Sequence, residues 1–242
     1  MTTFNLSSVI PSFRRTPRQP MVAIPEDHPH RRERARRVLN VVVATIGLVI
    51  SAPVMLLIAI AIKLTDRSGP ILYRQTRVGL CLRASQGGNF RRKQDLGGRP
   101  FTIYKFRTMR AARPGEEVQV WASENDPRIT RLGTFLRKTR LDELPQLWNV
   151  LRGDMNVVGP RPEQPAIFQT LRTDVQQYAA RQRVRPGITG LAQITLRYDT
   201  CVDDVRKKVE ADLTYIERQS LVQDLKIMAL TAPVMLFRKG SR

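Results

Sequence analysis

The feature that most constrains this chain is an apolar segment of about 25 residues, 38–62, without a charged side chain. A straight helix of this length rises roughly 37 Å, enough to cross a hydrocarbon core about 30 Å thick. Arginines crowd the chain before the segment, and Lys63, Arg67, Arg74 and Arg77 follow it. Because basic flanks stay on the cytoplasmic side of a membrane, both ends are predicted to lie on that side.

Pro53 offers this segment a way to turn back. It has no amide to bond the carbonyl of Val49, so a kink is expected there. Each half would be about 18 to 21 Å long, too short to cross a bilayer. The hydroxyl of Ser51 is expected to bond a carbonyl of the preceding turn, near Gly47. These features predict a re-entrant helix-break-helix hairpin over residues 35–65, with a Pro-kinked spanning helix as the alternative.

The charge of the chain indicates its partners. The sequence holds 41 Lys and Arg against 21 Asp and Glu, a net charge of +20. Such an excess favours nucleic acid or anionic membrane lipids. The apolar segment favours lipids, and no zinc-finger spacing or RNA-binding aromatic signature supports nucleic acid. Cys81 and Cys201 are too few for a disulfide framework and fit a reduced cytosolic location.

Three regions follow from composition. Residues 1–34 lack periodicity and are predicted to form a disordered basic arm. Residues 35–65 are predicted to form the hairpin, and residues 66–242 are predicted to form a domain on the cytosolic face that would hold any catalytic site. Its fold class is predicted as mainly α with a small antiparallel β element (α+β), in a monotopic membrane protein with amphipathic interfacial helices. The strand candidates 71–75 and 101–106 are expected to pair, joined by a polar loop at 83–98.

Helical patterning dominates after residue 126. Ile129, Leu132, Phe135 and Leu136 recur at intervals of three and four, which predicts an amphipathic helix. Segment 209–217 is interpreted as a solvated amphipathic helix without catalytic carboxylates. Residues 227–237 are apolar but short, so they are expected to pack or to dip into the membrane interface. Pro186-Gly187 and Gly190 predict turns.

Two adjacent carboxylates, Asp142 and Glu143, stand at the start of a segment with one apolar face. Asp142 suits an N-cap, Pro145 a first helical turn and Gly153 a helix end. In one interpretation, Asp142 caps the helix and Glu143 complements its dipole. In the other, the carboxylates hold a divalent cation and one of them attacks phosphorus.

Nearby basic residues favour the second interpretation. Arg137 lies upstream of the pair, and Arg161 is fixed between two prolines downstream. Rigid arginines suit phosphate oxygens. Lys105 and Arg107 alternate on the second predicted strand and so share one face. They are expected either to contact a nucleotide phosphate or lipid headgroup, or to form a plain exposed basic strand face.

Five segments carry a family resemblance. They are 105–109 (Lys-Phe-Arg-Thr-Met), 126–131 (Asp-Pro-Arg-Ile-Thr-Arg), 141–155 (Leu-Asp-Glu-Leu-Pro-Gln-Leu-Trp-Asn-Val-Leu-Arg-Gly-Asp-Met), 158–163 (Val-Gly-Pro-Arg-Pro-Glu) and 186–193 (Pro-Gly-Ile-Thr-Gly-Leu-Ala-Gln). With the apolar hairpin they resemble, in order, the bacterial sugar transferases, or monotopic phosphoglycosyl transferases, over roughly residues 35–240.

The resemblance implies an activity. It is the transfer of a sugar 1-phosphate, with glucose or galactose expected, from a UDP-sugar to undecaprenyl phosphate with release of UMP. This step initiates exopolysaccharide or related glycan synthesis. The family pattern makes Asp142 the nucleophile and Glu143 its partner, with Mg²⁺ bound at both and with Arg137 and Arg161 near the phosphates. It also implies the cytoplasmic face of the bacterial inner membrane, and leaves the oligomeric state open.

Two departures from the family pattern stand out. Ala52 separates Ser51 from Pro53, whereas the family usually has serine directly before the proline. The loop at 83–98 is also longer than is usual. The alternative from another class is a basic membrane scaffold or assembly factor of a polysaccharide pathway. The joint presence of Asp142 and Glu143 with two arginines favours the enzyme, because a scaffold needs none of them.

Overall fold

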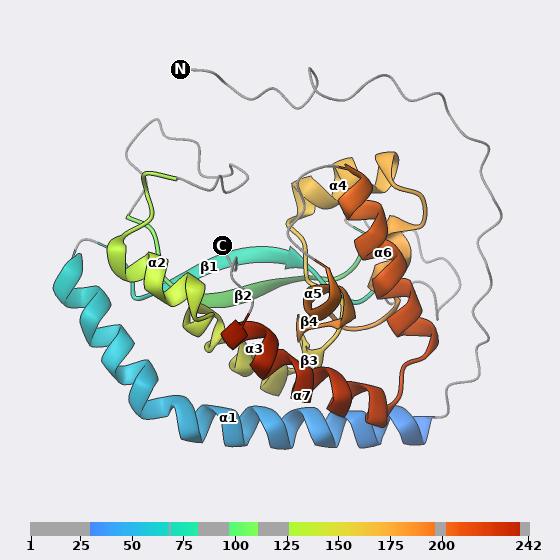
Figure 1. The fold of residues 1–242 in the computed structure, drawn as a ribbon, viewed down its shortest axis with the longest axis horizontal. Helices are drawn as coiled ribbons and strands as arrows, with labels where there is room; N and C mark the ends of the chain where they lie inside the picture. Colours follow the sequence, from blue (N-terminus) through green and yellow to red (C-terminus); the bar gives the residue numbers. More distant parts are fainter. Residues whose placement is uncertain (1–29, 68, 82–96, 111–125, 197–201, 238–242) are drawn as a thin grey trace.

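A computed structural model describes residues 30–67, 69–81, 97–110, 126–196 and 202–237 (Figure 1). Residues 1–29 of the predicted N-terminal arm and most of the predicted loop at 83–98 lie outside these residues, whereas residues 30–34 of that arm lie in α1. The elements are α1 (His30–Thr65), β1 (Leu72–Val78), β2 (Pro100–Phe106), α2 (Arg131–Lys138), η3 (Leu141–Glu143), α3 (Gln146–Arg152), β3 (Asn156–Val158), α4 (Pro165–Asp174), η4 (Tyr178–Arg183), β4 (Gly187–Thr189), α5 (Leu191–Thr195), α6 (Val202–Glu217) and α7 (Leu221–Phe237).

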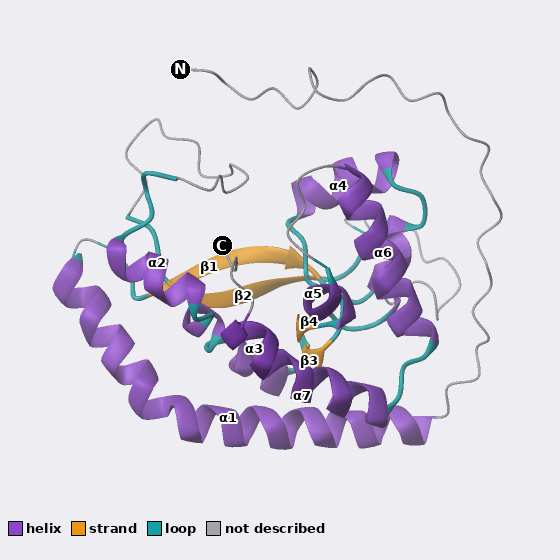
Figure 2. Cartoon of the chain, viewed as in Figure 1, coloured by secondary structure: helices purple, strands orange, loops and turns teal. Residues whose placement is uncertain are grey.

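The described residues are mainly helical and carry two small sheets (Figure 2). β1 and β2 pair antiparallel, from Leu72 opposite Phe106 to Val78 opposite Pro100, which confirms the predicted strand pair. β3 and β4 form a parallel pair that was not predicted. The prediction of a turn at Gly187 is wrong, because this residue begins β4.

Helix α1 runs along one side of the molecule and bends on its way (Figure 1). The predicted break is wrong, because the helix is continuous with Pro53 inside it. The Ser51 hydroxyl lies 3.5 Å from the Met55 sulfur rather than on a carbonyl of the preceding turn. Among the described residues, α1 is the one helix long and apolar enough to cross a membrane.

Polar contacts anchor the first half of α1 to the rest of the protein. Asn40 is buried and accepts a hydrogen bond from the Val157 amide of β3 at 2.5 Å. Arg37 donates to the carbonyls of Val150 and Leu151, both at 2.6 Å. A cation suits this place, because the last carbonyls of α3 lack helical partners. The first half of α1 is therefore fixed to both α3 and β3.

The end of α1 contacts the same body. Ile58 and Ile62 are buried in a cluster with Phe106 of β2 and Leu136 of α2. Directly after the helix, Asp66 pairs with Arg107 at 2.9 Å. Both halves of α1 are thus attached to one globular unit rather than to separate bodies.

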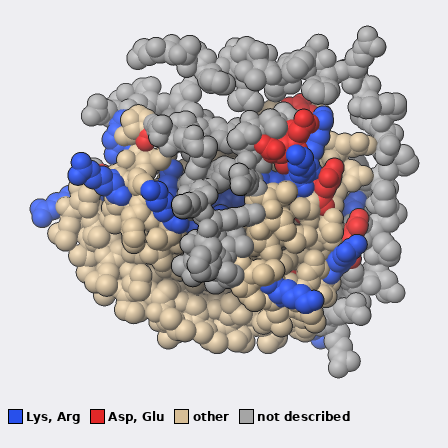
Figure 3. Space-filling model, viewed as in Figure 1, with Lys and Arg blue, Asp and Glu red and all other residues tan. Residues whose placement is uncertain are grey.

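The outer face of α1 is apolar and uncovered. Its large hydrophobic side chains are 41% to 71% exposed: Val38, Val42, Ile46, Val49, Ile50, Val54, Leu56, Leu57, Ile60 and Leu64. Figure 3 shows the charged side chains gathered over the upper half of this view, whereas the lower edge, along most of α1, is uncharged. A continuous apolar surface of this kind marks contact with a membrane or a protein.

The predicted amphipathic helix corresponds to α2. Thr130 caps it by accepting a hydrogen bond from the Gly133 amide, and Leu136 is buried as expected. Phe135 was expected on the apolar face, but its side chain is exposed. The four apolar positions, spaced three and four residues apart, span a wider part of the helix circumference than the part that packs against the rest of the protein.

The predicted helix over residues 142–153 is divided in two. The 3₁₀-helix η3 is preceded by Arg140 in the left-handed conformation, and α3 starts after Pro145. The prediction that Asp142 is an N-cap is therefore wrong, and its side chain caps neither helix. Gly153 ends α3 with a φ of +85°, as predicted, because this conformation suits a residue without Cβ.

The last two helices pack onto the core. Ile227 of α7 joins the main cluster with Met155 and Val158, which confirms that α7 packs against the domain. The interpretation of 209–217 as a solvated helix is wrong for its inner face. Asp212 and Tyr215 of α6 are only 2% and 1% exposed.

Candidate active site

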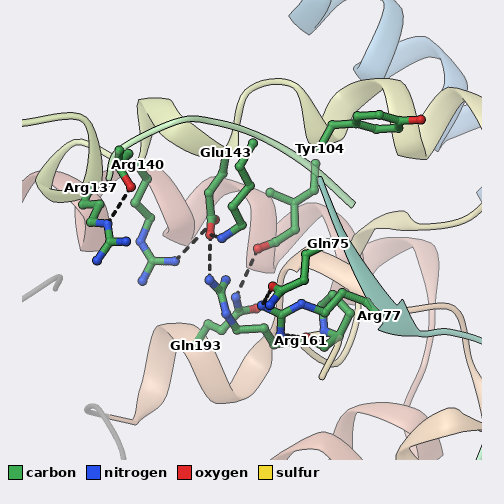
Figure 4. Close-up of polar contacts among 12 residues, drawn as sticks. Gln75, Arg77, Tyr104, Arg137, Arg140, Glu143, Arg161 and Gln193 are labelled. Atoms are coloured by element: carbon green, nitrogen blue, oxygen red, sulfur yellow. Dashed lines mark hydrogen bonds and ion pairs between the residues drawn. The ribbon is translucent and has the colours of Figure 1, made fainter. Parts of the chain in front are cut away.

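Strand β2 brings a lysine to the carboxylate pair. Lys105 Nζ lies 2.7 Å from Glu143 Oε1. Its neighbour Tyr104 points away from Glu143, as the alternation of side chains along a strand requires (Figure 4). β2 thus contributes one cation to the site, and η3 contributes both carboxylates.

Two arginines approach Glu143 as well (Figure 4). Arg161 Nη2 lies 2.6 Å from Glu143 Oε1, and Arg140 Nη1 lies 3.9 Å from Oε2. Arg140 was not predicted, and its spacing of three residues from Glu143 is the only sequence signal for it. Its φ of +54° belongs to the left-handed region, which is uncommon for residues other than glycine. Such strain concentrates at functional sites.

These cations set the charge of Glu143. Burial alone would raise the pKa of this carboxyl, but Arg161 and Lys105 outweigh it and hold the pKa well below its usual range. Burial conversely lowers the pKa of the Lys105 ammonium, although Glu143 opposes this change. Glu143 is consequently an ionised carboxylate, and its Oε1 is engaged by both Lys105 and Arg161.

Asp142 is in the opposite situation. Among the described residues, no donor lies within hydrogen-bonding distance of its carboxylate, and the residue is 7% exposed. Burial raises the pKa of Asp142; Lys105 opposes the rise and the adjacent Glu143 adds to it. A desolvated carboxylate without donors is more nucleophilic than one held by hydrogen bonds. The two neighbouring carboxylates therefore suit different tasks.

The other two predicted basic residues differ in their placement. Arg137 lies on the same side of Glu143 as Arg140 (Figure 4), and its Nε donates to Thr108 Oγ1 at 2.9 Å. Arg137 is also close enough to help lower the pKa of Asp142. Arg107 is not brought to the carboxylates, since it is buried against Asp66 behind the end of α1. The structure places Arg137 at the site and Arg107 outside it.

The fit of Mg²⁺ depends on the two carboxylates. Among the described residues, no group of three or more His, Cys, Asp or Glu side chains could hold a metal. Mg²⁺ in phosphate chemistry is usually bound by one or two carboxylates, with substrate phosphates and waters as its other ligands. The Asp142 oxygens, which accept no hydrogen bond from any described residue, lie next to Glu143 and fit this mode.

The arrangement defines a class of protein. A buried carboxylate, without a hydrogen-bond donor among the described residues, stands beside an ionised one, and four cations lie around the pair: Lys105, Arg137, Arg140 and Arg161. Such a cluster suits an enzyme that binds phosphate groups and attacks phosphorus through a side chain.

Comparisons with known proteins agree with this class. A family model described as bacterial sugar transferase matches residues 31–238. The chain is 45% identical over 203 residues to the UDP-glucose:undecaprenyl-phosphate glucose-1-phosphate transferase of Caulobacter vibrioides, across 83% of this chain and 69% of that protein. The chain belongs to the bacterial sugar transferase family, a family of enzymes.

Two further relatives are longer than this chain. A protein of Escherichia coli with the same name as the Caulobacter relative is 41% identical over 198 residues, which is 81% of this chain and 39% of the relative. The UDP-N-acetylgalactosamine-undecaprenyl-phosphate N-acetylgalactosaminephosphotransferase of Aeromonas hydrophila is 38% identical over 207 residues, 86% of this chain and 45% of the relative. The chain spans less than half the length of these two proteins.

Proposed function

We propose that the protein transfers a sugar 1-phosphate from a UDP-sugar to undecaprenyl phosphate through a covalent intermediate on Asp142. The observation that carries this proposal is the contrast within the pair: Glu143 is bound by Lys105 and Arg161, whereas Asp142 has no hydrogen-bond donor in the part of the chain that the structure describes. The names of the relatives support the choice of a UDP-sugar and undecaprenyl phosphate as substrates.

The first half-reaction uses the free carboxylate. An oxygen of Asp142 attacks the phosphorus that bears the sugar, and the bond from this phosphorus to the bridging oxygen breaks, releasing UMP. Arg161 and Arg137 bind the phosphate oxygens, whose negative charge must be neutralised in the transition state. Glu143 keeps Lys105 and Arg161 in place through its two short contacts.

The second half-reaction restores the enzyme. A phosphate oxygen of undecaprenyl phosphate attacks the same phosphorus, and the bond to Asp142 breaks, which regenerates the carboxylate. Mg²⁺, held by Asp142 and Glu143, would supply a positive charge that polarises the phosphoryl oxygens. The product is a sugar joined through a diphosphate to the lipid, and it starts the assembly of an exopolysaccharide or related glycan.

The placement of α1 supports attachment to one membrane leaflet. Asn40 and Arg37 fix its first half to β3 and α3, and Asp66 fixes its end to Arg107. If the helix crossed a bilayer, its two ends would be separated by about 30 Å of hydrocarbon. Contact of both ends with one globular body favours a re-entrant anchor at the cytoplasmic face of the inner membrane, close to anionic lipids.

The sugar is a narrower question. Two of the relatives are named for glucose 1-phosphate and one for N-acetylgalactosamine phosphate. We propose a hexose, with glucose as the first choice and galactose as the second.

The direct test is UMP release. The purified chain is incubated with Mg²⁺, undecaprenyl phosphate and each of a panel of UDP-sugars, and UMP is measured over time. With a hexose donor, UMP release that continues beyond one equivalent per protein chain only when the lipid phosphate is present supports the proposal. No release with any donor would instead support a scaffold or assembly factor without catalytic activity.

A further inference from the structure

The backbone that carries Arg161 is held at consecutive carbonyls. Between β3 and α4, the Pro160 carbonyl accepts from the Gly187 amide of β4 and the Glu163 carbonyl from the Val78 amide of β1, both at 2.9 Å. The two carbonyls between them accept from side chains. Arg181 Nη2 donates to the Arg161 carbonyl and Arg77 Nη1 to the Pro162 carbonyl, both at 3.1 Å.

Arg181 is the buried member of these side-chain donors. It lies in η4, is 5% exposed, and has its guanidinium carbon 4.9 Å from the centre of the Tyr178 ring. Its Nε donates to Asp212 Oδ2 of α6 at 2.7 Å, while its Nη2 faces the Arg161 carbonyl. One planar guanidinium thus joins α6 to the loop with two separate donors, which a lysine ammonium at one point cannot reproduce.

A buried ion pair of this kind needs an explanation. Desolvation of both charges costs as much free energy as the pair regains, so stability alone is a weak reason to keep one. Burial alone would lower the pKa of Arg181, but Asp212 together with Tyr178 and Glu163 outweighs burial and raises the pKa, so Arg181 stays charged. Two apolar residues of equal size in place of Arg181 and Asp212 could not make the second contact, which is the hydrogen bond to the Arg161 carbonyl.

We propose that Arg181 and Asp212 are positioning residues that hold the Arg161 main chain, so that the Arg161 guanidinium stays on Glu143 and meets the donor phosphate. This inference rests on the proposed function, in which Arg161 binds that phosphate. The path is short: Asp212 orients Arg181, Arg181 binds the Arg161 carbonyl, and the Arg161 side chain lies 2.6 Å from Glu143.

The test begins with Arg181→Lys, which keeps the charge opposite Asp212 but removes the second donor. We expect the single-turnover rate of UMP release to fall roughly ten- to a hundredfold, since small displacements of a positioning group cost this much. Asp212→Asn keeps the side-chain volume and serves as the second variant, with the same expected loss. The matched control is Asp203→Asn, which breaks an exposed aspartate-arginine pair on the same helix and should change the rate by less than about twofold.

A double-mutant cycle separates positioning from simple destabilisation. If Arg181 acts through Arg161, Arg181→Lys should change the rate by less than about twofold in an Arg161→Ala background. The same cycle is measured on the Kd of the UDP-sugar in an Asp142→Asn background, so that a signal remains when the residual rates are very low. An equal loss with and without Arg161, or no loss in the wild-type background, would overturn the positioning role.

The outcomes also distinguish this inference from the proposed function. Failure of the proposed function appears as no UMP release from the wild-type chain with any donor. Failure of the positioning role appears as an active wild-type chain in which Arg181→Lys and Arg161→Ala have additive effects in the double-mutant cycle.

Discussion

The charge environment of single residues separates two neighbouring carboxylates into different roles. Asp142 and Glu143 share one 3₁₀ turn, yet burial raises the pKa of the first, while Arg161 and Lys105 overcome burial and depress that of the second. Neighbouring acids with pKa values pushed apart are typical of acid-base and nucleophilic sites. The difference arises from distance, since among the described residues the cations lie within ion-pair distance of the Glu143 carboxylate and not of the Asp142 carboxylate.

Asp142→Asn should abolish the reaction. The amide has the same shape as the carboxylate but is no nucleophile toward phosphorus, so transfer and the covalent phosphosugar adduct should fall by more than about a thousandfold. Mass spectrometry of the intact protein after incubation with donor alone measures the adduct. Membrane association should be unchanged, and Asp203→Asn should form the adduct normally. Near wild-type turnover in Asp142→Asn would show that the nucleophile is another group.

The rate should also depend on pH through Asp142. The nucleophile must be ionised, and burial raises its pKa above the ordinary aspartate value. The rate of adduct formation should therefore fall on acidification before an ordinary aspartate would become protonated. Lys105→Met removes a cation that lowers the pKa of Asp142. The fall in the rate on acidification, the acidic limb of the pH profile, should therefore occur at higher pH in this variant. Single-turnover rates across the acidic range measure it, and a limb that stays in place or moves to lower pH would refute the assignment.

The residues of the site were only partly predictable. Motifs identified Asp142, Glu143, Arg137, Arg161 and Lys105, all of which the structure brings together. Arg140 and the Arg181–Asp212 pair were not identified, because long-range packing selects them and no local pattern marks them. Arg107 shares the strand periodicity of Lys105 but lies just beyond β2, where it pairs with Asp66, directly after the end of α1.

At the scale of elements, glycines let β3 and β4 approach closely. A Cβ on Gly187 would collide with the Gly159 amide nitrogen and the Thr189 carbonyl, which are backbone atoms that cannot move aside. Gly187→Ala should therefore destabilise the strand pair by about 1 to 3 kcal/mol. In thermal denaturation in detergent, Tm should fall by about 2 to 4 °C for each kcal/mol lost.

Gly47→Ala is the matched control for this variant. A Cβ at this position in α1 would meet only the flexible end of Leu147, 3.1 Å away, so its Tm should change little. Because the Arg161 loop joins β3 to α4, Gly187→Ala should also lower UMP release. An unchanged Tm in Gly187→Ala would mean that the two strands are not packed this closely.

Long elements were easier to predict than short ones. β1 and β2 have strand-like composition and were found, whereas β3 and β4 have three residues each, too few to show an alternating pattern. The division of the predicted 142–153 helix also has a local cause. Pro145 lacks an amide, which suits the start of α3 and not the interior of a longer helix.

At the scale of the whole molecule, α1 is linked to the site by polar contacts as well as by packing. Arg36 donates to the Tyr215 hydroxyl at 2.9 Å, and this hydroxyl lies 3.2 Å from the Val158 carbonyl, at the end of β3. Burial raises the pKa of Tyr215, so its hydroxyl stays protonated. The apolar helix and the loop that bears Arg161 are therefore parts of one rigid arrangement. The height of α1 in a membrane should set the height of the carboxylate pair.

This arrangement predicts the topology of α1. Single cysteines are introduced by Arg34→Cys or Arg67→Cys, in a background with Cys81→Ser and Cys201→Ser. Both positions are exposed and flank the apolar segment. A re-entrant anchor places both on the cytoplasmic side, since both ends of α1 contact one body. A membrane-impermeant maleimide should label both in inside-out vesicles and neither in intact spheroplasts.

Asp203→Cys in the same background reports the side of the catalytic domain, because this residue is exposed on α6. If α1 crossed the bilayer, Arg34→Cys and Arg67→Cys would react from opposite sides. Only one of these two cysteines could then be labelled from the same side of the membrane as the cysteine of Asp203→Cys. The contacts of Arg37 with α3 and of Asp66 with Arg107 could not both persist in such a protein, because hydrocarbon about 30 Å thick would separate them. Labelling from opposite sides would thus refute the re-entrant anchor and one half of the α1 interface together.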